Sequence, residues 1–447
     1  MTTIFALASA QGRAGVAVLR VSGEKAGLVF SRLCKPAHFP EPRVATLRAL
    51  IDERSEDLLD RALVIWFPAP HSFTGENVVE IQLHGGRAVI ASVCDALASL
   101  PDFEPAGPGA FSRRAFENGK LDLTEAEAIA DLVEAETSAQ QRQALRQMDG
   151  ALGRLYHDWA ERLKHALAFM EASIDFADED VPAEISENQR GAIKAVAAEL
   201  AAHLDDDHRG ERLREGFMVA LLGPPNAGKS SLMNALARRD AAIVSSTPGT
   251  TRDVIEVHLD LGGWPLCLAD TAGLRECAEE IESEGVRRAL ARAETADLKI
   301  LVFDGASDLS KDEKLRALID DRTIAVLNKA DLLKDNEPPP YWAPDSLRVS
   351  AKTGQGIEAL VQAIIDRIDL RYGAGGEISG APSLTRARHR LALEECRSHL
   401  ARAATVTDDV LCTEDVRLAV RALGRITGRV DVEDLLDLIF SEFCIGK

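Results

Sequence analysis

The chain has 447 residues, and 46% of them are hydrophobic, so it is long enough to bury two or three separate cores. Its formal net charge of −20 excludes a protein that coats nucleic acid unspecifically, because such binding requires many phosphates to be neutralised. Its seven cysteines show no paired C-x-x-C spacing, which argues against a disulfide framework or a zinc site and favours a reduced, cytoplasmic location.

The first 118 residues have the texture of an α+β domain. Short apolar runs at 4–10, 62–67 and 78–83 are separated by proline and glycine, a pattern typical of strands joined by turns. The run at 4–10 is too short to cross a membrane, and no other run in the sequence is long and apolar enough. The sequence therefore predicts an N-terminal domain over residues 1–118 and no membrane span.

From Leu121 the pattern changes to that of amphipathic helices. Thr124 and Glu127 have the spacing of a capping box, which predicts a helix start there. Apolar residues then recur at intervals of three and four, at Leu145, Met148, Leu152, Leu155, Trp159 and Leu163. We expect a first helical segment over 119–210.

Two linkers are predicted on either side of a central domain, at 205–216 and 373–382. A domain over 216–372 lies between them, and a second helical segment follows over 380–447, ending in an apolar stripe. Spacing alone does not show whether the two helical segments form one domain.

The segment 223–230 (GPPNAGKS) has the pattern of a phosphate-binding loop. The apolar run FMVALL precedes it as a predicted strand, and SLMNALARR follows it as a predicted helix, so unpaired backbone N–H groups would point at a bound phosphate. Gly223 and Gly228 let the backbone approach closely, Lys229 reaches the outer phosphates, and the hydroxyl of Ser230 ligates Mg²⁺. By itself the pattern also fits a glycine-rich turn before a helix.

Three further segments follow in the order found in guanine-nucleotide-binding proteins. Asp270 ends an apolar strand and would hold the water shell of Mg²⁺, and the N–H of Gly273 would meet the γ-phosphate. In NKAD, Asp331 can accept hydrogen bonds from N1–H and the 2-amino group of guanine, a donor pair that adenine lacks. Ser350 begins a last base-contacting loop. Together the segments predict a site for GTP.

The polar segment 245–253 (SSTPGTTRD) is predicted to be a switch in which Thr251 gives Mg²⁺ a second hydroxyl. Its residue types alone fit a polar turn equally well. Leu274 stands where Ras-like proteins carry a glutamine that orients the attacking water, so another group must do this. The acidic stretch 276–284 offers candidates, with a solvated surface as the alternative, and Asn226 could hold a monovalent cation beside the phosphates.

These motifs, with FTGENVVEIQLHGG at 73–86, AFENGKLDL at 115–123 and FCIGK at 443–447, resemble the MnmE/TrmE family of tRNA-modification GTPases. The resemblance implies a multidomain α/β fold with an N-terminal α+β tetrahydrofolate-binding-like domain, an α-helical domain and an inserted Ras-like P-loop GTPase domain. It also implies GTP hydrolysis coupled to the addition of a (carboxymethyl)aminomethyl group to carbon 5 of the wobble uridine in certain tRNAs.

The resemblance also implies the cofactors and partners. The cofactors are GTP, Mg²⁺, K⁺ and a tetrahydrofolate derivative, either 5,10-methylene or 5-formyl. The chain would form a homodimer through its N-terminal domain and a heterotetramer with an FAD-dependent protein of the MnmG/GidA type, and tRNA would be the substrate.

Residue by residue, the resemblance implies five sets of functional residues. The GTP-binding set is Asn226, Ala227, Gly228, Lys229, Ser230, Ser231, Ser245, Ser246, Thr247, Pro248, Gly249, Thr250, Thr251, Asp270, Thr271, Ala272, Gly273, Asn328, Lys329, Asp331, Ser350, Ala351 and Lys352. Mg²⁺ would be held by Ser230 and Thr251, and K⁺ by Asn226, Ser245, Thr247 and Thr250. The folate-binding set is Arg20, Glu80, Lys120 and Lys447. The catalytic set is Glu282, which would orient water, with Lys229, Thr251, Asn226 and the thiol of Cys444.

Ala110 departs from the family pattern, which has glutamate at this place, so the details of the folate site are open. Two groups of arginines are hypothesised to face tRNA or an acidic partner, with solvated helix faces as the alternative. Arg417, Arg421 and Arg425 recur every four residues on a predicted helix, with Arg429 beyond it, and Arg386, Arg388 and Arg390 cluster after the glycine-rich linker. The second functional class is a GTP-switched ribosome or RNA assembly factor without modification chemistry. Such a factor would need neither a folate site nor Cys444.

Overall fold

The computed structural model describes residues 2–10, 12–175, 183–239, 242–243, 256–270, 294–307, 316–333, 340, 343–372, 382–430 and 433–446. The chain divides into two units, each of them discontinuous in sequence. The first contains residues 1–130, 147–196 and 395–447, and the second contains residues 131–146 and 197–394.

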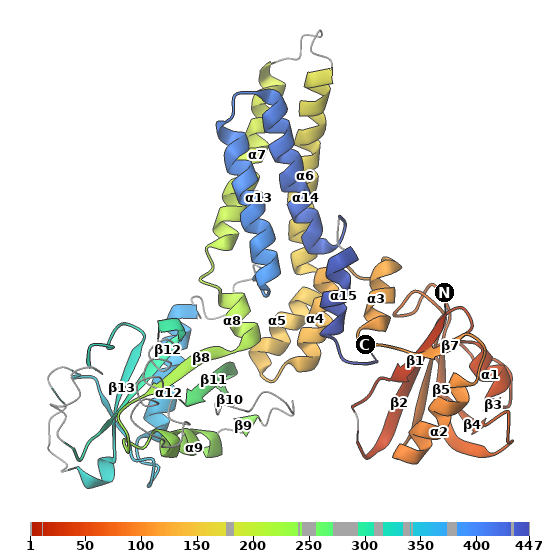
Figure 1. The fold of residues 1–447 in the computed structure, drawn as a ribbon, viewed down its shortest axis with the longest axis horizontal. Helices are drawn as coiled ribbons and strands as arrows, with labels where there is room; N and C mark the ends of the chain where they lie inside the picture. The colour runs from red at the N-terminus through yellow and green to blue at the C-terminus, as the bar shows by residue number, and fades with distance from the viewer. Residues whose placement is uncertain are drawn as a thin grey trace, which may run out of the picture. The chain divides into compact units, whose positions relative to one another are not determined.

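The N-terminal part of the first unit is a sheet with α1 and α2 packed on one face (Figure 1), while Phe111 of α3 packs against Ile4 and Ala6 on the other. The strand order is β3-β4-β5-β6-β2-β1-β7, antiparallel except where β1 pairs with β7. The bounds are β1 (Thr3–Leu7), β2 (Ala14–Ser22), β3 (Cys34–Lys35), β4 (Thr46–Ile51), β5 (Leu58–Phe67), β6 (Val78–Gly85) and β7 (Phe103–Pro105), with α1 (Leu28–Arg32), α2 (Arg87–Ala98) and α3 (Ala110–Glu117).

Alternation along the strands decides which face of this sheet is buried. Leu19, Val64 and Ile81 have no exposed surface and pack with residues of α1 and α2 in one hydrophobic core. The residues that alternate with them along each strand point to the opposite face of the sheet, which is not part of that core. The predicted strands at 62–67 and 78–83 are confirmed as parts of β5 and β6.

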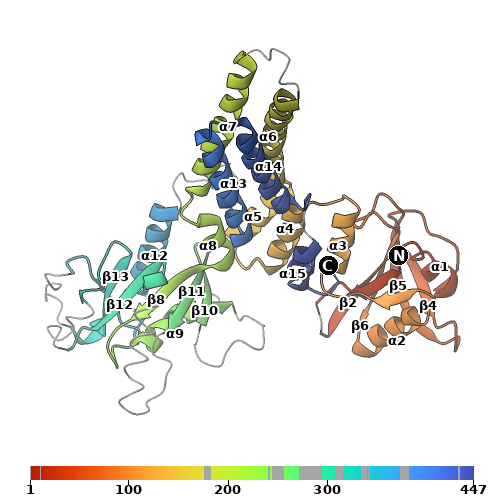
Figure 2. The same cartoon turned by 45° about the horizontal axis from the view of Figure 1, so that its top comes forward.

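The helical part of the first unit joins segments that are far apart in the sequence. Its helices are α6 (Ala151–Asp175), α14 (Asp409–Thr427), α15 (Glu433–Ser441) and the portions within this unit of α4 (Leu123–Glu134), α7 (Ala183–Leu204) and α13 (Ala387–Thr405). α14 lies along α6 in both views (Figures 1 and 2), and Trp159 of α6 and Val416 of α14 are buried. The α-helical domain implied by the resemblance is therefore present.

The capping box of α4 lies two residues before the predicted one. The Asp122 carboxylate accepts a hydrogen bond from the N–H of Glu125 at 2.9 Å, and the Glu125 carboxylate accepts one from the N–H of Asp122 at 2.8 Å. Thr124 and Glu127, the predicted pair, are instead buried. Both pairs have the same spacing, so sequence alone could not separate them.

The second unit contains a mostly parallel sheet, in which the described strands are ordered β14-β13-β12-β8-β11-β10-β9. They are β8 (Phe217–Leu222), β9 (Ala242–Ile243), β10 (Glu256–Leu261), β11 (Trp264–Asp270), β12 (Leu298–Asp304), β13 (Thr323–Asn328) and β14 (Leu347–Arg348). The helices α5 (Ser138–Met148), α8 (Arg209–Glu215), α9 (Lys229–Arg239) and α12 (Ile357–Tyr372) accompany them. β8 and β12 are almost continuously buried, as expected for central strands of a parallel sheet.

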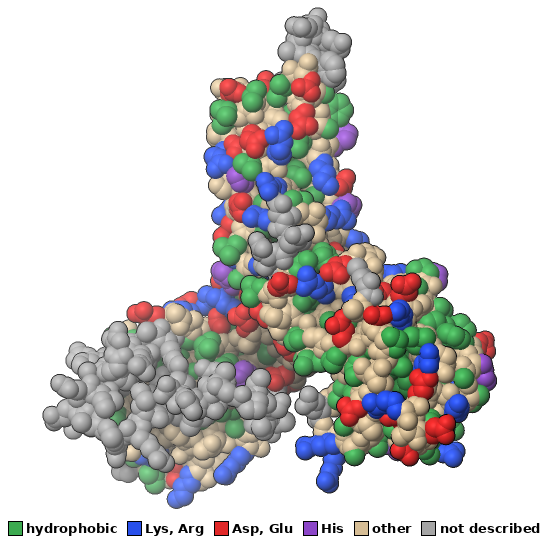
Figure 3. Space-filling view, turned by 45° about the vertical axis from the view of Figure 1, so that its right-hand side comes forward, with side chains coloured by type: hydrophobic (Ala, Val, Ile, Leu, Met, Phe, Trp, Pro, Cys, Tyr) green, Lys and Arg blue, Asp and Glu red, His purple; other side chains and the backbone are tan. Residues whose placement is uncertain are grey.

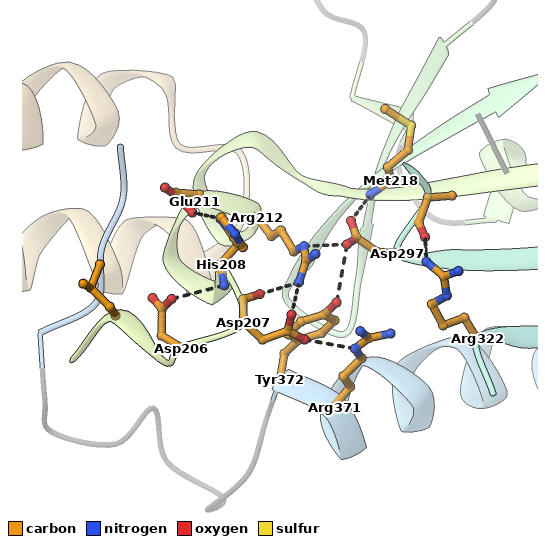
Figure 4. A network of polar contacts seen from close by, with 12 residues as sticks. Asp206, Asp207, His208, Glu211, Arg212, Met218, Asp297, Arg322, Arg371 and Tyr372 are labelled. Carbon is orange, nitrogen blue, oxygen red and sulfur yellow. Dashed lines mark hydrogen bonds and ion pairs between the residues drawn. The ribbon is translucent and has the colours of Figure 1, made fainter. Parts of the chain in front are cut away.

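The predicted linker at 205–216 is not a linker throughout, because it contains α8. This helix is held by charges on both sides (Figure 4). Arg212 pairs with Asp297, just before β12, at 2.6 Å, and its guanidinium lies 5.1 Å from the centre of the Tyr372 ring at the end of α12. Glu211 pairs with Arg390 at 3.0 Å. The charged residues of this predicted linker are thus used for packing.

Asp297 also connects α8 and the end of α12 to the start of β8. Its carboxylate accepts a hydrogen bond from the N–H of Met218 in β8 at 2.9 Å and another from the Tyr372 hydroxyl at 3.4 Å. Burial raises the pKa of Asp297, although Met218 and Arg212 act in the opposite direction. The segments that lead into and out of this sheet therefore meet beside β8.

Candidate functional site

The predicted phosphate loop follows β8 at the carboxyl end of the sheet, where open α/β folds bind ligands. Lys229 opens α9 and is 8% exposed, and its ammonium donates hydrogen bonds to the carbonyls of Gly223 at 2.8 Å and Pro224 at 3.0 Å. A Cβ added to Gly223 would lie 2.2 Å from the carbonyl oxygen of Val302, so only glycine fits against β12. The loop is therefore closed around the lysine.

Backbone conformation gives this loop its open, N–H-rich shape. Asn226 and Gly228 have φ angles of +63° and +92°, in the left-handed region. The Asn226 side chain is exposed, as is that of Ser230 in the first turn of α9. Successive N–H groups at a helix N-terminus favour an anion, so the arrangement suits the phosphates of a nucleotide.

Asn328 connects the phosphate loop to the predicted base-binding loop. It is 3% exposed, its amide donates to the carbonyl of Ala227 at 2.7 Å, and its amide oxygen accepts from the N–H of Ala351 at 3.1 Å. A Cβ on Gly228 would lie 2.2 Å from the Asn328 amide nitrogen. A side chain predicted to touch the base thus also fixes the backbone around the phosphates.

Asp331, the predicted guanine-reading carboxylate, follows β13 in a 3₁₀ helix, Ala330–Leu332. The buried hydroxyl of Ser350 donates to it at 2.6 Å, and this hydrogen bond lowers the pKa of Asp331. The carboxylate therefore stays ionised and held in one orientation while it keeps capacity to accept further hydrogen bonds.

Sequence reasoning missed Asp304, the last residue of β12. It is opposite Asn328 in the parallel register, and its carboxylate pairs with the ammonium of Lys329 at 2.6 Å. Lys329 itself has a φ of +61°, a left-handed conformation that this ion pair helps to hold. The available signal was an aspartate at the carboxyl end of an apolar run, LKILVFD.

Part of the predicted site lies outside the described residues. The backbone of Asp270 ends β11 opposite Leu221 of β8, beside the phosphate loop, but its side chain is not described. The other predicted residues outside the described ranges are Ser245, Ser246, Thr247, Pro248, Gly249, Thr250, Thr251, Thr271, Ala272, Gly273, Glu282 and Lys447.

The predicted folate residues Arg20 and Glu80 are neighbours on the face of the N-terminal sheet opposite α1 and α2, where both side chains are largely buried. They are opposite each other in the β2–β6 register, and Arg20 donates to one carboxylate oxygen from Nε at 3.0 Å and from Nη2 at 2.8 Å. The guanidinium also lies 5.3 Å from the ring centre of Phe73 and 5.8 Å from that of Phe111. Charge and aromatic surface are therefore combined at one place.

Lys120 lies against the loop that contains Phe73. Its aliphatic carbons lie against Gly75, where an added Cβ would be 3.1 Å from Lys120 Cε. The loop is fixed by Glu76, which accepts hydrogen bonds from Arg114 at 2.9 Å and from the Ser22 hydroxyl at 2.7 Å. Lys120 therefore lies beside the loop whose Phe73 contacts Arg20.

Cys444 lies in a tail that pairs with the N-terminal domain. Ile445 forms a β-bridge with Pro108, the N–H of Gly109 donates to the carbonyl of Cys444 at 3.4 Å, and the Cys444 side chain is exposed. Ala110, the departure from the family pattern, packs with Phe111 in a small apolar cluster, so it serves as a packing residue here.

Several arginines hypothesised to face tRNA are paired within the chain. Arg417 pairs with Glu171 at 2.7 Å, and Arg386 pairs with Asp131 at 2.7 Å. Arg425 pairs with Glu395. Figure 3 shows basic and acidic side chains interspersed over the helices. These contacts offset much of the positive charge, so the structure gives the hypothesis no support.

Within the described ranges, none of the helices combines the length and the hydrophobicity of a membrane span.

Comparisons with known proteins cover the chain from end to end. A family model described as the GTP-binding protein TrmE N-terminus matches residues 3–120, and one described as the MnmE helical domain matches residues 123–444. The tRNA modification GTPase MnmE of Paramagnetospirillum magneticum is 55% identical over all of this chain and 99% of its own length. That of Parvibaculum lavamentivorans is 56% identical over the full length of both.

A human mitochondrial protein, 5-taurinomethyluridine-[tRNA] synthase subunit GTPB3, is 48% identical over all of this chain and 93% of its own length. Both family models and full-length similarity agree with the loop and base-site geometry. The chain belongs to the MnmE/TrmE family of tRNA-modification GTPases.

Proposed function

We propose that this GTPase, with an FAD-dependent partner of the MnmG/GidA type, adds a (carboxymethyl)aminomethyl group to carbon 5 of the wobble uridine in certain tRNAs. Similarity to a human subunit named for 5-taurinomethyluridine synthesis supports modification at that position of uridine. The observation that carries the GTP-dependent part is Asn328, which joins the phosphate loop to the loop beside Asp331.

In the proposed hydrolysis step, Lys229 and the backbone N–H groups of residues 226–230 hold the phosphates, and Asp331 selects guanine. Ser230 and Thr251 hold Mg²⁺, which when bound offsets charge on the phosphates. The exposure of the Ser230 side chain in the first turn of α9 fits this role. Glu282 orients the attacking water in place of the glutamine that Leu274 replaces.

K⁺ is proposed to bind between Asn226 and the segment with Ser245, Thr247 and Thr250. Asn226 fits because its exposed side chain stands on a left-handed turn of the phosphate loop. A monovalent cation there would stabilise charge that develops between the β- and γ-phosphates.

The folate site is proposed at Arg20, Glu80, Lys120 and Lys447. Both hydrogen bonds from Arg20 go to the same oxygen of Glu80, so the second oxygen is available to accept from the amino and N–H groups of a pteridine. Arg20 and Lys120 would meet the acidic tail or the ring carbonyl. When bound, a methylene- or formyl-tetrahydrofolate supplies the one-carbon unit, and the thiol of Cys444 acts at this step.

A cytoplasmic homodimer is proposed through the exposed β4–β5 part of the face of the N-terminal sheet opposite α1 and α2. Leu47 and Leu63 are paired in register on this face and are 62% and 40% exposed. They stand on the same side of the sheet as Arg20 and Glu80, so a second copy that covers the leucines would adjoin the folate site.

The test combines two readouts. GTP turnover is measured in K⁺ and in Na⁺, with and without the flavoprotein, and the nucleosides of the treated tRNA are then analysed. K⁺ should stimulate wild-type turnover and should not stimulate an Asn226→Ala variant, whereas equal rates in both salts would refute the cation site.

Cys444→Ser should keep GTP turnover and lose modification, with Cys94→Ser, in the N-terminal helix α2, as the control that keeps both. If the wild-type protein leaves the tRNA unmodified, the assembly-factor alternative is favoured.

A further inference from the structure

Arg48 is a buried arginine that the proposed function does not use. It lies in β4 opposite Ala62 of β5 and is 4% exposed. The Ala62 side of the sheet is the one that packs on α1 and α2, whereas Arg20 and Glu80 belong to the opposite side. The Arg48 guanidinium is therefore separated from the proposed folate site by the sheet itself.

The guanidinium has few partners. Nη2 lies 3.2 Å from the Nε2 atom of His38 and 3.5 Å from the His38 carbonyl oxygen, and Nε is buried with no hydrogen-bond partner. Among the residues that the structure describes, which include all of this domain except positions 1 and 11, no carboxylate lies within 4.0 Å of it. Arg48 is thus a buried cation without a counter-ion.

Two other poorly exposed arginines among the described residues, Arg114 and Arg390, are paired with carboxylates. Arg114 bonds to Glu76 and to two backbone carbonyls, and Arg390, which is 8% exposed, pairs with Glu211 and Asp206. An arginine cannot relieve its burial by losing a proton, so an unpaired buried one destabilises the fold. The difference between Arg48 and these two indicates that its negative partner comes from outside the chain.

An ion would reach the Arg48 guanidinium at the segment between β3 and β4. His38 and Phe39 lie in the segment between β3 and β4, and both are exposed, Phe39 by 54%. This segment covers Arg48, and His38 places an imidazole nitrogen at the same edge of the guanidinium. Because so little of Arg48 is exposed, a compact ion can reach it more readily than a nucleic-acid backbone.

We propose that the guanidinium of Arg48, oriented by its hydrogen bond to Nε2 of His38, binds a small free oxyanion of the phosphate or carboxylate class. One singly or doubly charged oxyanion would supply the missing counter-charge and accept hydrogen bonds from the guanidinium, the geometry in which arginine binds such groups best. The site depends on neither GTP hydrolysis nor folate.

The test uses the full-length protein saturated with GDP and Mg²⁺, so that the phosphate loop is filled. Thermal unfolding is followed in chloride, phosphate and acetate at equal ionic strength. Phosphate or acetate should raise the midpoint of the wild type in a concentration-dependent, saturable way. Arg48→Leu should lose this shift and be at least as stable as the wild type in chloride, because the apolar side chain removes an unpaired charge.

The matched control is Arg32→Leu, which removes an exposed arginine from the same domain, one that pairs with Glu53. It should keep the full shift. The proposal is overturned if Arg48→Leu keeps the shift, or if it is severely destabilised in chloride, since Arg48 would then be satisfied by the chain itself. A weakened affinity of Arg48→Leu for tRNA, with unchanged response to free phosphate, would overturn the assignment to a small ion.

Discussion

Gly109 sets the position of the C-terminal tail, and its replacement by alanine provides a quantitative test. Its φ is +63°, and an added Cβ would lie 2.5 Å from the carbonyl oxygen of Phe440 and 2.9 Å from Phe440 Cβ. The left-handed conformation costs about 1–2 kcal/mol for a residue with a side chain. To restore ordinary contact, Phe440 must retreat by about 1 Å, which adds about 1–3 kcal/mol if the tail stays in place.

We therefore expect Gly109→Ala to lower the free energy of unfolding of the first unit by about 2–5 kcal/mol, or to release the tail. Either response disturbs the bridge between Pro108 and Ile445, so amide hydrogen exchange of the peptide 441–446 should rise. The control is Gly107→Ala, because a Cβ there meets nothing within 4 Å. It should stay within about 0.5 kcal/mol of the wild type.

Thermal unfolding and exchange mass spectrometry measure these effects, and tRNA modification is assayed alongside GTP turnover. Gly109→Ala should lower modification while turnover stays unchanged, because Gly109 is remote in sequence from the GTP-binding motifs and contacts the segment that contains Cys444. The reasoning is refuted if the two alanine variants behave alike in unfolding and exchange.

Three other predictions concern the second unit. Asn328→Ala leaves a buried carbonyl and an N–H unpaired, so GTP affinity measured by fluorescence titration should fall about 10–100-fold; an unchanged affinity would contradict the bridging role. Asp331→Asn should weaken GTP and favour xanthosine triphosphate, whose 2-carbonyl accepts from the new amide; competition assays would show otherwise if GTP stayed preferred. Burial opposes ionisation of Asp320, but hydrogen bonds from Lys299 and Thr323 outweigh it and lower its pKa to about 2. Its stabilising effect is therefore complete above the unfolded-state pKa near 3.8 and lost as pH falls toward 2, so the difference in melting temperature between wild type and Asp320→Asn should shrink over that range. A constant difference would show that ionisation is not the cause.

Sequence patterns predicted the parts of the fold that depend on local preference. The buried run at 217–222 is β8 at the predicted positions, since a continuous apolar segment before a glycine-rich loop has few alternatives. Lys229, Asn328 and Asp331 were found from motifs, and the structure brings their loops to one edge of the sheet. Their roles in GTP hydrolysis stay predictions.

What sequence could not supply were choices between equivalent patterns and contacts across the chain. Asp122 was chosen over Thr124 as the helix cap by tertiary packing, since both have the required spacing. α8 was not predicted because its charged side chains pair with residues far away in sequence, such as Asp297 for Arg212. Nor does any local signal indicate that Arg48 would be buried without a carboxylate, because alternation predicts only which side of a strand a residue occupies.

The meeting of α8, Asp297 and Tyr372 at one corner has a consequence for how such a protein could arise. The two ends of the GTP-binding module lie next to each other, because Arg212 just before it contacts Tyr372 at its end. The module is therefore inserted into the rest of the chain at one point, as a loop would be. A module with adjacent ends can be acquired, exchanged or lost without rethreading the rest of the chain. Grafting a related module between residues 216 and 372 should therefore preserve the folding of the helical and N-terminal domains, as long as the graft offers an acidic partner for Arg212.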